Sequence, residues 1–431
     1  MKGNAELINR LVFTLVMLAV YRVGVHVPSP GVDGLEVFNF FKNYSSGVLG
    51  LFNTFSGGAL AQFSVFALGI MPYISASIIF QLLSSSVPAL EALKKEGDAG
   101  RKKISQYTRY LTIVLAVIQS LGVSSWLLNS TGASGHSLVV AGMSFLQFKV
   151  LTVVTLTAGT AFVMWLAEQI TDRGIGNGSS LIIFTGIASS IPGGIAKLYS
   201  LLSSGELSFI GLIILLSLMI GVIYFVVFCE VAQRRLPITY SQRISTQGGA
   251  GAHLPIKLNF SGVIPPIFAS SLLMFPATIF QFTNVSWLKG IQESLSPNGV
   301  IYNILFSLLI VFFCFFYSEV VFNVNEIAEN LRKNGGFVPG VRAGRATVEF
   351  INTILARLNV AGSLYLVAIC ILPGILINSF NVPFYFGGTS LLILVGVAMD
   401  TAQQIQGYLI SNKYAAASSK RNVILNRRVK F

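Results

Sequence analysis

The sequence contains few charged residues and few of the side chains that catalyse reactions or bind metals. Only 10% of its 431 residues are Asp, Glu, Lys or Arg, which is too few for a soluble globular domain. The histidines His26, His136 and His253 are far apart, and the three cysteines lie singly, without the paired spacing of a metal site or disulfide framework. No nucleophile elbow or phosphate-binding glycine loop is present. These absences argue against an enzyme and against a bound metal or cofactor.

Long apolar runs dominate the sequence. Hydrophobic residues make up 53% of the chain and the mean hydropathy is +0.73, as expected for a protein that folds in lipid. About 20 apolar residues cross the hydrocarbon core of a bilayer. Windows of this length predict ten membrane-spanning helices, near residues 7–25, 64–85, 107–128, 146–167, 178–197, 208–229, 262–282, 301–322, 360–378 and 386–408. The window at 178–197 is the weakest, because it is rich in Gly and Ser.

The distribution of basic residues requires this weak span. With ten spans both termini lie on one side of the membrane, and that side collects all but five of the 29 basic residues. The exceptions are Arg22, Lys42, Lys149, Lys197 and Lys289. By the positive-inside rule both termini are predicted to be cytoplasmic, with residues 409–431 as a basic tail. The net charge of +13 does not distinguish RNA, acidic proteins and anionic lipids as partners.

A short motif occurs twice, 193 residues apart. GIMPYISAS at residues 69–77 and GVIPPIFAS at residues 262–270 are identical at five of nine positions, including Pro72 with Pro265. The repeat predicts two related halves, although two proline-containing helices can also match by chance. Proline lacks an amide hydrogen and clashes with the preceding turn, so each copy is expected to kink or loosen its helix at mid-membrane. Interrupted helices at corresponding places in two halves indicate a transport pathway.

One apolar segment, LGLFNTFSGGALAQF at residues 49–63, is too short to cross a membrane. Its length is typical of a re-entrant or interfacial element. Gly57 and Gly58 permit a sharp turn, and Phe52 and Phe55 are three residues apart and so share a helical face. The residues alone leave two alternatives open. The segment either fills a space in the protein or lies on the outer surface as an amphipathic helix.

Four acidic residues lie near the ends of apolar spans: Glu168, Glu230, Glu319 and Asp400. A proton- or sodium-coupled transporter needs such a group near the middle of the bilayer. The predicted topology places all four toward the cytoplasmic ends of their helices. We therefore interpret them as interfacial carboxylates within reach of water and of loop arginines.

Seven ordered motifs extend from the first span to the last: FNTFSGGAL, FALGIMPYISASIIFQLL, EGDAGRKKISQYTRY, EQITDRGIGNGSSLIIF, GVIPPIFASS, GGFVPGVRAG and VPFYFGGTSLLI. Together they resemble the SecY family, the channel subunits of bacterial protein translocation. The resemblance implies an all-α membrane protein with ten helices in two inverted halves, here residues 1–205 and 206–408. It also implies an external plug helix and a lateral gate through which membrane segments leave the pore.

The same resemblance implies a passive pore for unfolded preproteins in the bacterial cell membrane. The implied partners are the small membrane subunits SecE and SecG, the ATPase motor SecA, the ribosome and the signal sequences of preproteins. Anionic lipids are a further expected partner of the basic cytoplasmic surface.

The resemblance assigns a pore constriction to a ring of isoleucines. The matching residues are Ile70, Ile74, Ser179, Ile183, Ile267 and Ile393. Ser179 replaces the family's usual isoleucine and is a polar gap in the ring. Branched apolar side chains block ions by dewetting and offer a passing polypeptide no polar site that traps it. Ordinary packing between helices is the alternative for each isoleucine.

The plug resemblance falls on Phe52, Asn53 and Phe55. The lateral gate falls on the second, third, seventh and eighth spans, with Gln81 and Asn259 as its polar residues. A buried amide is unfavourable in apolar surroundings unless it is paired, so polar residues along a helix seam make closure reversible.

Two cytoplasmic loops, residues 230–259 and 323–358, are too long for simple helix links and have arginines among glycines and prolines. The resemblance implies that Arg243, Arg342 and Arg345 bind the motor or the ribosome, whose RNA phosphates attract basic side chains. A solvated positive-inside face is the alternative. A secondary transporter for a small solute and a structural membrane scaffold are alternative functions that explain fewer of these features.

Overall fold

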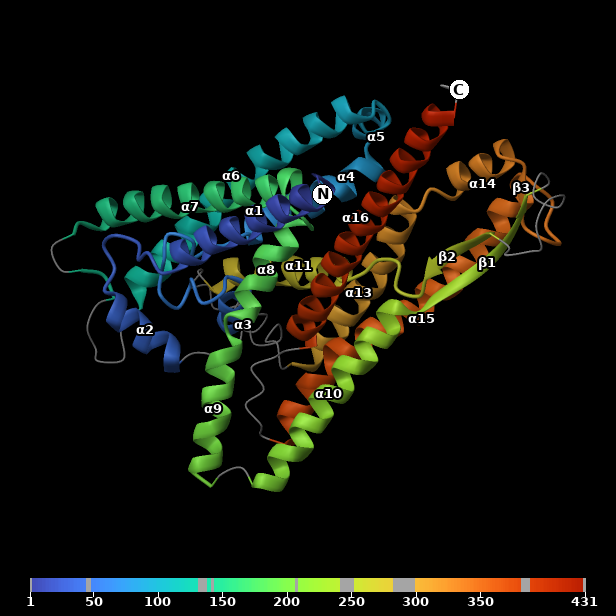
Figure 1. The fold of residues 1–431 in the computed structure, drawn as a ribbon. Coiled ribbons are helices and arrows are strands. Elements are labelled where there is room, and N and C mark those ends of the chain that lie inside the picture. The colour runs from blue at the N-terminus through green and yellow to red at the C-terminus, as the bar shows by residue number, and fades with distance from the viewer. Residues whose placement is uncertain are drawn as a thin grey trace. The chain divides into compact units, whose positions relative to one another are not determined.

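The computed structural model describes residues 2–43, 48–130, 138–140, 143–205, 208–240, 252–281, 299–380 and 388–428. Most of these residues are helical (Figure 1). The helices are α1 (Lys2–Val25), α2 (Gly34–Asn43), α3 (Val48–Phe55), α4 (Met71–Ser86), α5 (Pro88–Lys95), α6 (Asp98–Asn129), α7 (Phe145–Arg173), α8 (Gly178–Ala188), α9 (Ile191–Ser203), α10 (Phe209–Val231), α11 (Ile264–Gln281), α13 (Val300–Val321), α14 (Val324–Lys333), α15 (Arg345–Phe380) and α16 (Gly388–Arg428). The strands are β1 (Gln233–Tyr240), β2 (Ala252–Lys257) and β3 (Gly336–Phe337).

Each of the ten predicted spans overlaps a helix. Among the described residues, seven candidate spans are long and apolar enough to cross a membrane, and α4 with α5 adds an eighth if this pair, bent by 96°, is one span. The Gly- and Ser-rich window is one of the seven, because α8 and α9 together provide a candidate span over Gly178–Ser203. α11 contains a shorter apolar helix, Ile264–Met274.

The second span begins later than its apolar window indicates. The window starts at residue 64, but α4 starts at Met71 and is preceded by a series of turns. Three glycines in this region, Gly57, Gly58 and Gly69, have φ angles of +69°, +88° and +55°. Such angles are incompatible with a right-handed helix, so hydropathy alone overestimated the length of α4.

The chain forms two compact units. The first comprises Met1–Pro192, Met274–Gln292 and Val397–Phe431, and the second comprises Gly193–Leu273 and Glu293–Gly396. In the first unit α6 and α7 lie side by side, and α7 also packs against α1 and α8 (Figure 1). The division into repeat-related halves at residue 205 remains a prediction.

α7 begins with a capping box, in which the Ser144 backbone N–H donates to the Gln147 side chain at 3.2 Å and the Ser144 hydroxyl accepts from the Gln147 backbone.

The packing of α7 helps to place the turns that precede α4. Gly159, near the middle of α7, lies against the backbone of Val65. A Cβ at Gly159 would collide with the Val65 carbonyl oxygen, so the glycine permits this close approach.

The second unit contains a small domain built from both long loops. β1 pairs antiparallel with β2 and with β3, in the order β2-β1-β3. Its apolar cluster combines side chains from β1, β2, α14 and α15: Leu236, Ile256, Val324, Ile351, Ile354 and Leu355. The segments 230–259 and 323–358, predicted as cytoplasmic loops too long for simple helix links, contain strands and helices. Alternate burial of Leu236 and Ile238 is the period-2 pattern that makes β1 a strand.

α15 continues without a break from this domain into an apolar segment. Its 36 residues correspond to a length of about 54 Å, compared with about 30 Å for the hydrocarbon core of a bilayer. The predicted span at 360–378 is only the second half of this helix, so its first half extends the span into the small domain.

Both copies of the repeat begin a helix in the same way. Gly69 and Gly262 have φ angles of +55° and +61°, and α4 and α11 begin two residues after them. The first-turn hydrogen bonds also correspond. The backbone N–H of Ile74 donates to Ile70 at 3.1 Å, and that of Ile267 donates to Val263 at 3.4 Å.

The proline of each repeat lies at the second position of its helix. Pro72 and Pro265 occupy the first turn, where a missing N–H leaves no hydrogen bond unmade. A break in the chain at Gly69 or Gly262 precedes each proline, and its place at mid-membrane stays a prediction. The predicted kink is wrong, because these prolines start helices and do not bend them. The proline inside α11 is Pro276, outside the repeat.

Candidate functional site

The first unit contains four of the six predicted ring residues. Ile70 is the residue before α4, Ile74 lies in its first turn, and Ile183 lies in α8. All three side chains are buried. Because Ile74 is hydrogen-bonded to Ile70 across one turn, the two side chains share a face.

Ser179, the polar ring residue, is engaged by the cap of its own helix. It lies four residues before Ile183, in the first turn of α8, and is half-buried. Its hydroxyl donates to Oδ1 of Asn177 at 2.6 Å. The same oxygen accepts from the backbone N–H groups of Ser179 and Ser180. The polarity of Ser179 is therefore satisfied locally.

The other two ring residues belong to the second unit. Ile267 lies in the first turn of α11, at the position that corresponds to Ile74 in the repeat, and Ile393 lies in α16. Both are buried, Ile393 completely. The convergence of the six residues on one constriction remains a prediction.

The 49–63 segment is packed inside the first unit. Phe52 and Phe55, on one face of α3, are only 5% and 4% exposed. The Asn53 side-chain oxygen accepts from the backbone N–H of Ala61 at 2.8 Å, and its carbonyl accepts from Gly58 at 2.8 Å. Asn53 thus closes the turn that follows α3. Burial of both phenylalanines favours a segment inside the protein over a surface helix.

Two side chains of α1 bind this turn. The Tyr21 hydroxyl donates to the carbonyl of Ser56 at 3.1 Å, and Nη1 of Arg22 donates to the carbonyl of Gly57 at 2.6 Å. Tyr21 is completely buried and Arg22 is half-buried. The last turn of α1 therefore holds the end of α3 through two backbone carbonyls.

Gly57 also lies directly against α8. A Cβ at Gly57 would be 2.7 Å from the Cα of Gly186, whereas a Cβ at Gly58 would meet nothing within 4 Å. Both glycines have positive φ. Space and backbone conformation together require glycine at position 57, and backbone conformation alone favours it at position 58.

The predicted gate residue Gln81 lies on α4. Its Nε2 donates to Ser77 Oγ at 3.3 Å, one turn earlier. Its Oε1 is buried and has no hydrogen-bond partner among the described residues. Half of this amide is therefore unsatisfied in an apolar helix face.

Asn259, the other predicted gate residue, is 2% exposed and lies just before α11. Its Nδ2 donates to Oε1 of Glu230 at 2.6 Å and to the carbonyl of Gly262 at 3.1 Å. Its Oδ1 is buried without a partner in the described part of the chain. The role of Gln81 and Asn259 in one gate remains a prediction.

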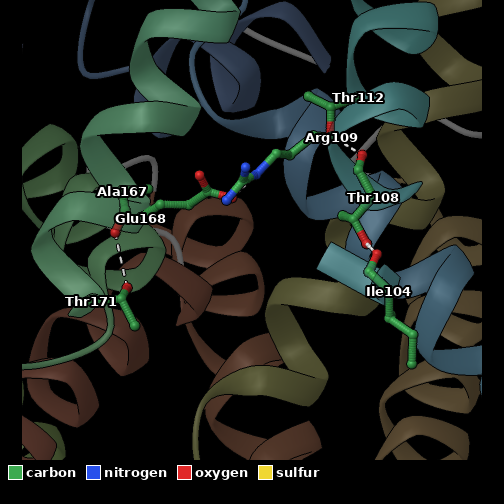
Figure 2. Close-up of polar contacts among 7 residues, drawn as sticks. All are labelled: Ile104, Thr108, Arg109, Thr112, Ala167, Glu168 and Thr171. Carbon is green, nitrogen blue, oxygen red and sulfur yellow. Dashed lines mark hydrogen bonds and ion pairs between the residues drawn. The ribbon is translucent and has the colours of Figure 1, made fainter. Parts of the chain in front are cut away.

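The four acidic residues near span ends differ in their surroundings. Glu319 and Asp400 are exposed, in agreement with the interfacial interpretation. Glu168 on α7 is 15% exposed, and its carboxylate lies 2.7 Å from the guanidinium of Arg109 on α6. Figure 2 shows these two side chains pointing toward each other. Glu230 lies near the end of α10, as the interpretation requires, but its expected access to water is wrong, because its side chain is 8% exposed and bound to Asn259.

The arginine loop, residues 335–344, projects from the small domain of the second unit. Gly340 and Gly344 have φ angles of +81° and +105°, and the carbonyl of Arg342 accepts from the Thr347 hydroxyl at 3.0 Å. The Arg342 side chain is exposed, and its guanidinium has no partner among the described residues. The loop therefore presents a free cation on a fixed backbone.

Arg345 borders a hollow of about 490 Å³ next to this loop, between the start of α15 and α14. It pairs with Glu349 at 3.4 Å, but both side chains are largely exposed, so the pair contributes little to stability. In the same hollow a hydrogen bond from Lys333 lowers the pKa of the Glu329 carboxyl. Arg243 lies outside the described residues.

Three contacts in these sites were missed by sequence reasoning. They are the bond from Arg22 to Gly57, the close approach of Gly57 to Gly186, and the bond from Asn259 to Glu230. Only the first left a signal, since Arg22 is one of the five basic residues that break the charge rule. The other two join residues far apart in the chain without any shared motif.

The described fold is shared by solved structures of other proteins. It is similar to a solved structure described as a protein conducting channel, with a TM-score of 0.69, 18% identity and coverage of 93% of this chain and 92% of that one. It is also similar to Sec61 in the canine ribosome-channel complex from the endoplasmic reticulum, with a TM-score of 0.65 and 18% identity over 93% and 92% of the two chains.

Sequence comparison identifies the family. The SecY family model matches residues 64–402. Protein translocase subunit SecY of Escherichia coli K12 is 46% identical over 98% of this chain and 96% of its own length, and that of Vibrio cholerae is 45% identical over the same shares. The chain therefore belongs to the SecY family. Its fold is predominantly helical and polytopic, with one small sheet, and ten membrane helices in two inverted halves are consistent with the family fold.

Proposed function

We propose that this chain is the pore-forming subunit of a protein translocation channel in the bacterial cell membrane. It passes unfolded preproteins across the membrane and releases apolar segments into lipid through a lateral gate. The observation that supports this most directly is a helix start that occurs twice, at Gly69 and again 193 residues later at Gly262. In each copy a buried isoleucine, Ile74 or Ile267, follows at the same position. Repeated interruptions of this kind are typical of a pathway lined by two related halves.

The resting pore is closed by an apolar ring and a plug. Ile70, Ile74, Ile183, Ile267 and Ile393 supply branched apolar side chains that exclude water and ions. The buried face of α3 supports the assignment of Phe52, Asn53 and Phe55 to the plug. Tyr21 and Arg22 hold the end of this plug in the resting state.

The lateral gate opens because its polar residues are incompletely paired. Gln81 and Asn259 each have one buried amide oxygen that has no hydrogen-bond partner in the part of the chain that the structure describes. Such an atom reduces the stability of the closed arrangement, so a signal sequence that supplies replacement contacts shifts the population toward the open state.

Partners provide the energy for transport, and the chain itself catalyses no reaction. SecA or the ribosome binds the cytoplasmic side through Arg342, Arg345 and Arg243, and SecE and SecG complete the membrane complex. Two neighbours in fold support a ribosome partner. One is the canine Sec61 complex already described, and the other is a yeast Ssh1 complex bound to the 80S ribosome, with a TM-score of 0.62 and 15% identity over 91% and 88% of the chains. Both termini face the cytoplasm.

Reconstitution tests this function. The chain is placed in lipid vesicles with SecE and SecG, and SecA, ATP and an unfolded preprotein are added outside. We expect the preprotein to become protease-protected only when ATP and a functional signal sequence are both present. The control is the same preprotein without its signal. Protection that is independent of ATP, or uptake of a small solute with no protection of preprotein, would refute the channel.

A further inference from the structure

Glu230 is a buried carboxylate to which the proposed translocation function assigns no role. It is the second-last residue of α10 and is 8% exposed. A buried carboxylate is strongly unfavourable unless charged or polar groups compensate it. Here the amide of Asn259 donates to it at 2.6 Å, the length of a strong charge-assisted hydrogen bond. The two residues are 29 positions apart, so the bond joins α10 to the segment that leads into α11.

The orientation of the Asn259 amide follows from its partners. Nδ2 faces Glu230 and the carbonyl of Gly262, and a carbonyl can only accept. Turning the amide over would bring two acceptors together at both contacts, so the nitrogen must face these groups. Oδ1 therefore points the other way, where it is buried and has no partner among the described residues.

The backbone around Asn259 is held from other helices as well. The Ser261 hydroxyl donates to the carbonyl of Cys314 on α13 at 3.0 Å. On α15, a Cβ at Gly362 would lie 2.9 Å from the carbonyl oxygen of Leu258, so the helix backbone is close to this segment. Three helices thus surround the residues that lead into α11, and they restrict movement of the amide toward another donor.

We propose that Glu230 is a positioning residue for Asn259. The Glu230 carboxylate accepts the hydrogen bond from Nδ2 of Asn259. The Asn259 Oδ1 is then oriented to accept a hydrogen bond from an N–H or O–H group of the signal segment. The gate then distinguishes an apolar signal that contains a hydrogen-bond donor from one of the same shape that lacks it. This inference rests on the proposed function, because it requires Asn259 to line the gate.

The test compares threonine with valine in the passenger. Thr and Val have the same shape, but only Thr has a hydroxyl. Each position of a signal's apolar segment is replaced in turn by Thr and by Val, and export of each preprotein is measured in cells that contain the full translocase. The Thr-to-Val ratio is the export of the Thr variant divided by that of the Val variant at the same position. Comparing this ratio between channel variants cancels the intrinsic difference between the two residues in lipid.

In the unmodified channel we expect one or two signal positions with a raised ratio. Asn259→Leu removes the acceptor and should lower the ratio there by about tenfold, the factor typical of one buried hydrogen bond. Glu230→Leu releases the amide and should lower it in the same way. The two substitutions together should have no larger effect on the ratio than either alone, because Glu230 is proposed to affect the signal through Asn259. Glu230→Gln retains an acceptor oxygen and should preserve the ratio.

Glu319→Leu is the matched control, because it removes an exposed carboxylate from α13. It should leave the ratio unchanged. An unchanged ratio in Glu230→Leu, or fully additive losses in the combined variant, would overturn the proposal. If Asn259→Leu leaves every ratio unchanged while preproteins are still exported, the gate role of Asn259 fails and the proposal with it, but the channel function stands. Absence of all preprotein export by the unmodified chain would instead refute the channel function.

A second set of variants tests the pairing of Glu230 with Asn259 in case the Glu230→Leu protein does not accumulate in the membrane. Asn259→Asp places two carboxylates in contact and should impair export. Adding Glu230→Gln to it exchanges the donor and the acceptor of the original bond and should restore export. Recovery supports direct pairing of the two residues, and no recovery overturns it.

Discussion

Replacing Gly57 with alanine tests whether the turn after α3 holds the plug in its resting position. Gly57 has a φ of +69°, and an alanine in this left-handed region costs about 1–2 kcal/mol. The new Cβ would also lie 2.7 Å from the Cα of Gly186, a backbone atom that no side-chain rotation can move. Overpacking of this kind costs about 1–3 kcal/mol. The packed position of the turn should therefore lose about 2–5 kcal/mol.

Gly58→Ala isolates the backbone contribution. Its φ is +88°, and the new Cβ would meet nothing within 4 Å. The two variants differ by the collision with Gly186 and by a 3.3 Å contact with Nη1 of the flexible Arg22 side chain. The collision, worth about 1–3 kcal/mol, raises the population of the displaced segment about 5- to 150-fold. Both alanines have the same effect on the entropy of the unfolded chain, so that contribution cancels in the comparison.

The assay is ion conductance of the purified complex in a planar bilayer without preprotein. We expect a larger resting leak from Gly57→Ala than from Gly58→Ala, with deletion of residues 49–58 as the upper limit. Equal leaks from the two alanine variants would refute the role of the Gly186 contact. An unchanged conductance after the deletion would refute the plug assignment itself.

Three further predictions concern the loop, the ring and α1. Arg342→Glu should abolish preprotein transport but leave membrane insertion normal, because an exposed loop charge contributes little to stability, and near wild-type transport would contradict the docking role. Ile74→Asn should raise resting conductance and allow export of passengers with defective signals, since an unpaired polar group in an apolar gate costs about 1–3 kcal/mol. Ser179→Ile should have the opposite effect and make weak signals fail. Wild-type conductance and export in both variants would show that these residues serve only ordinary packing. Arg22→Met should raise resting conductance through loss of the bond to the plug turn, and Lys149→Met, which removes a charge stacked on an aromatic ring, should not; equal conductance in the two variants would contradict the role of Arg22.

The apolar spans were predictable because membrane helices are determined largely by length and hydropathy. Even the Gly- and Ser-rich span at 178–197 was found, since the sidedness of basic residues required it. The beginning of α4 was not predicted correctly, whereas α11 begins within two residues of its window, and the role of proline was wrong in both. Proline was read as a kink, but positive φ at Gly69 and Gly262 breaks the chain just before it and leaves proline in a first turn.

The candidate site was predictable only where single residues were involved. Burial of Ile70, Ile74 and Phe52 agrees with what their apolar side chains and spacing indicate. The role of Glu230 depends on a partner 29 residues away, and the glycine at 186 depends on a turn of another segment. Pairings of this kind are determined by tertiary packing, and neither periodicity nor charge distribution contains them.

The continuity of α15 has a mechanical consequence. Ile351, Ile354 and Leu355 attach its first half to the sheet and to α14, and Arg345 is its first residue. An α-helix resists bending, because each turn is joined to the next by backbone hydrogen bonds. A force applied by a bound partner near Arg345 is therefore transmitted along α15 as a tilt of the whole rod, with little local distortion. The helix is a lever about 54 Å long, so if a partner binds at Arg345 as proposed, a small displacement there reorients the opposite end of the helix without any chemical signal passing between them.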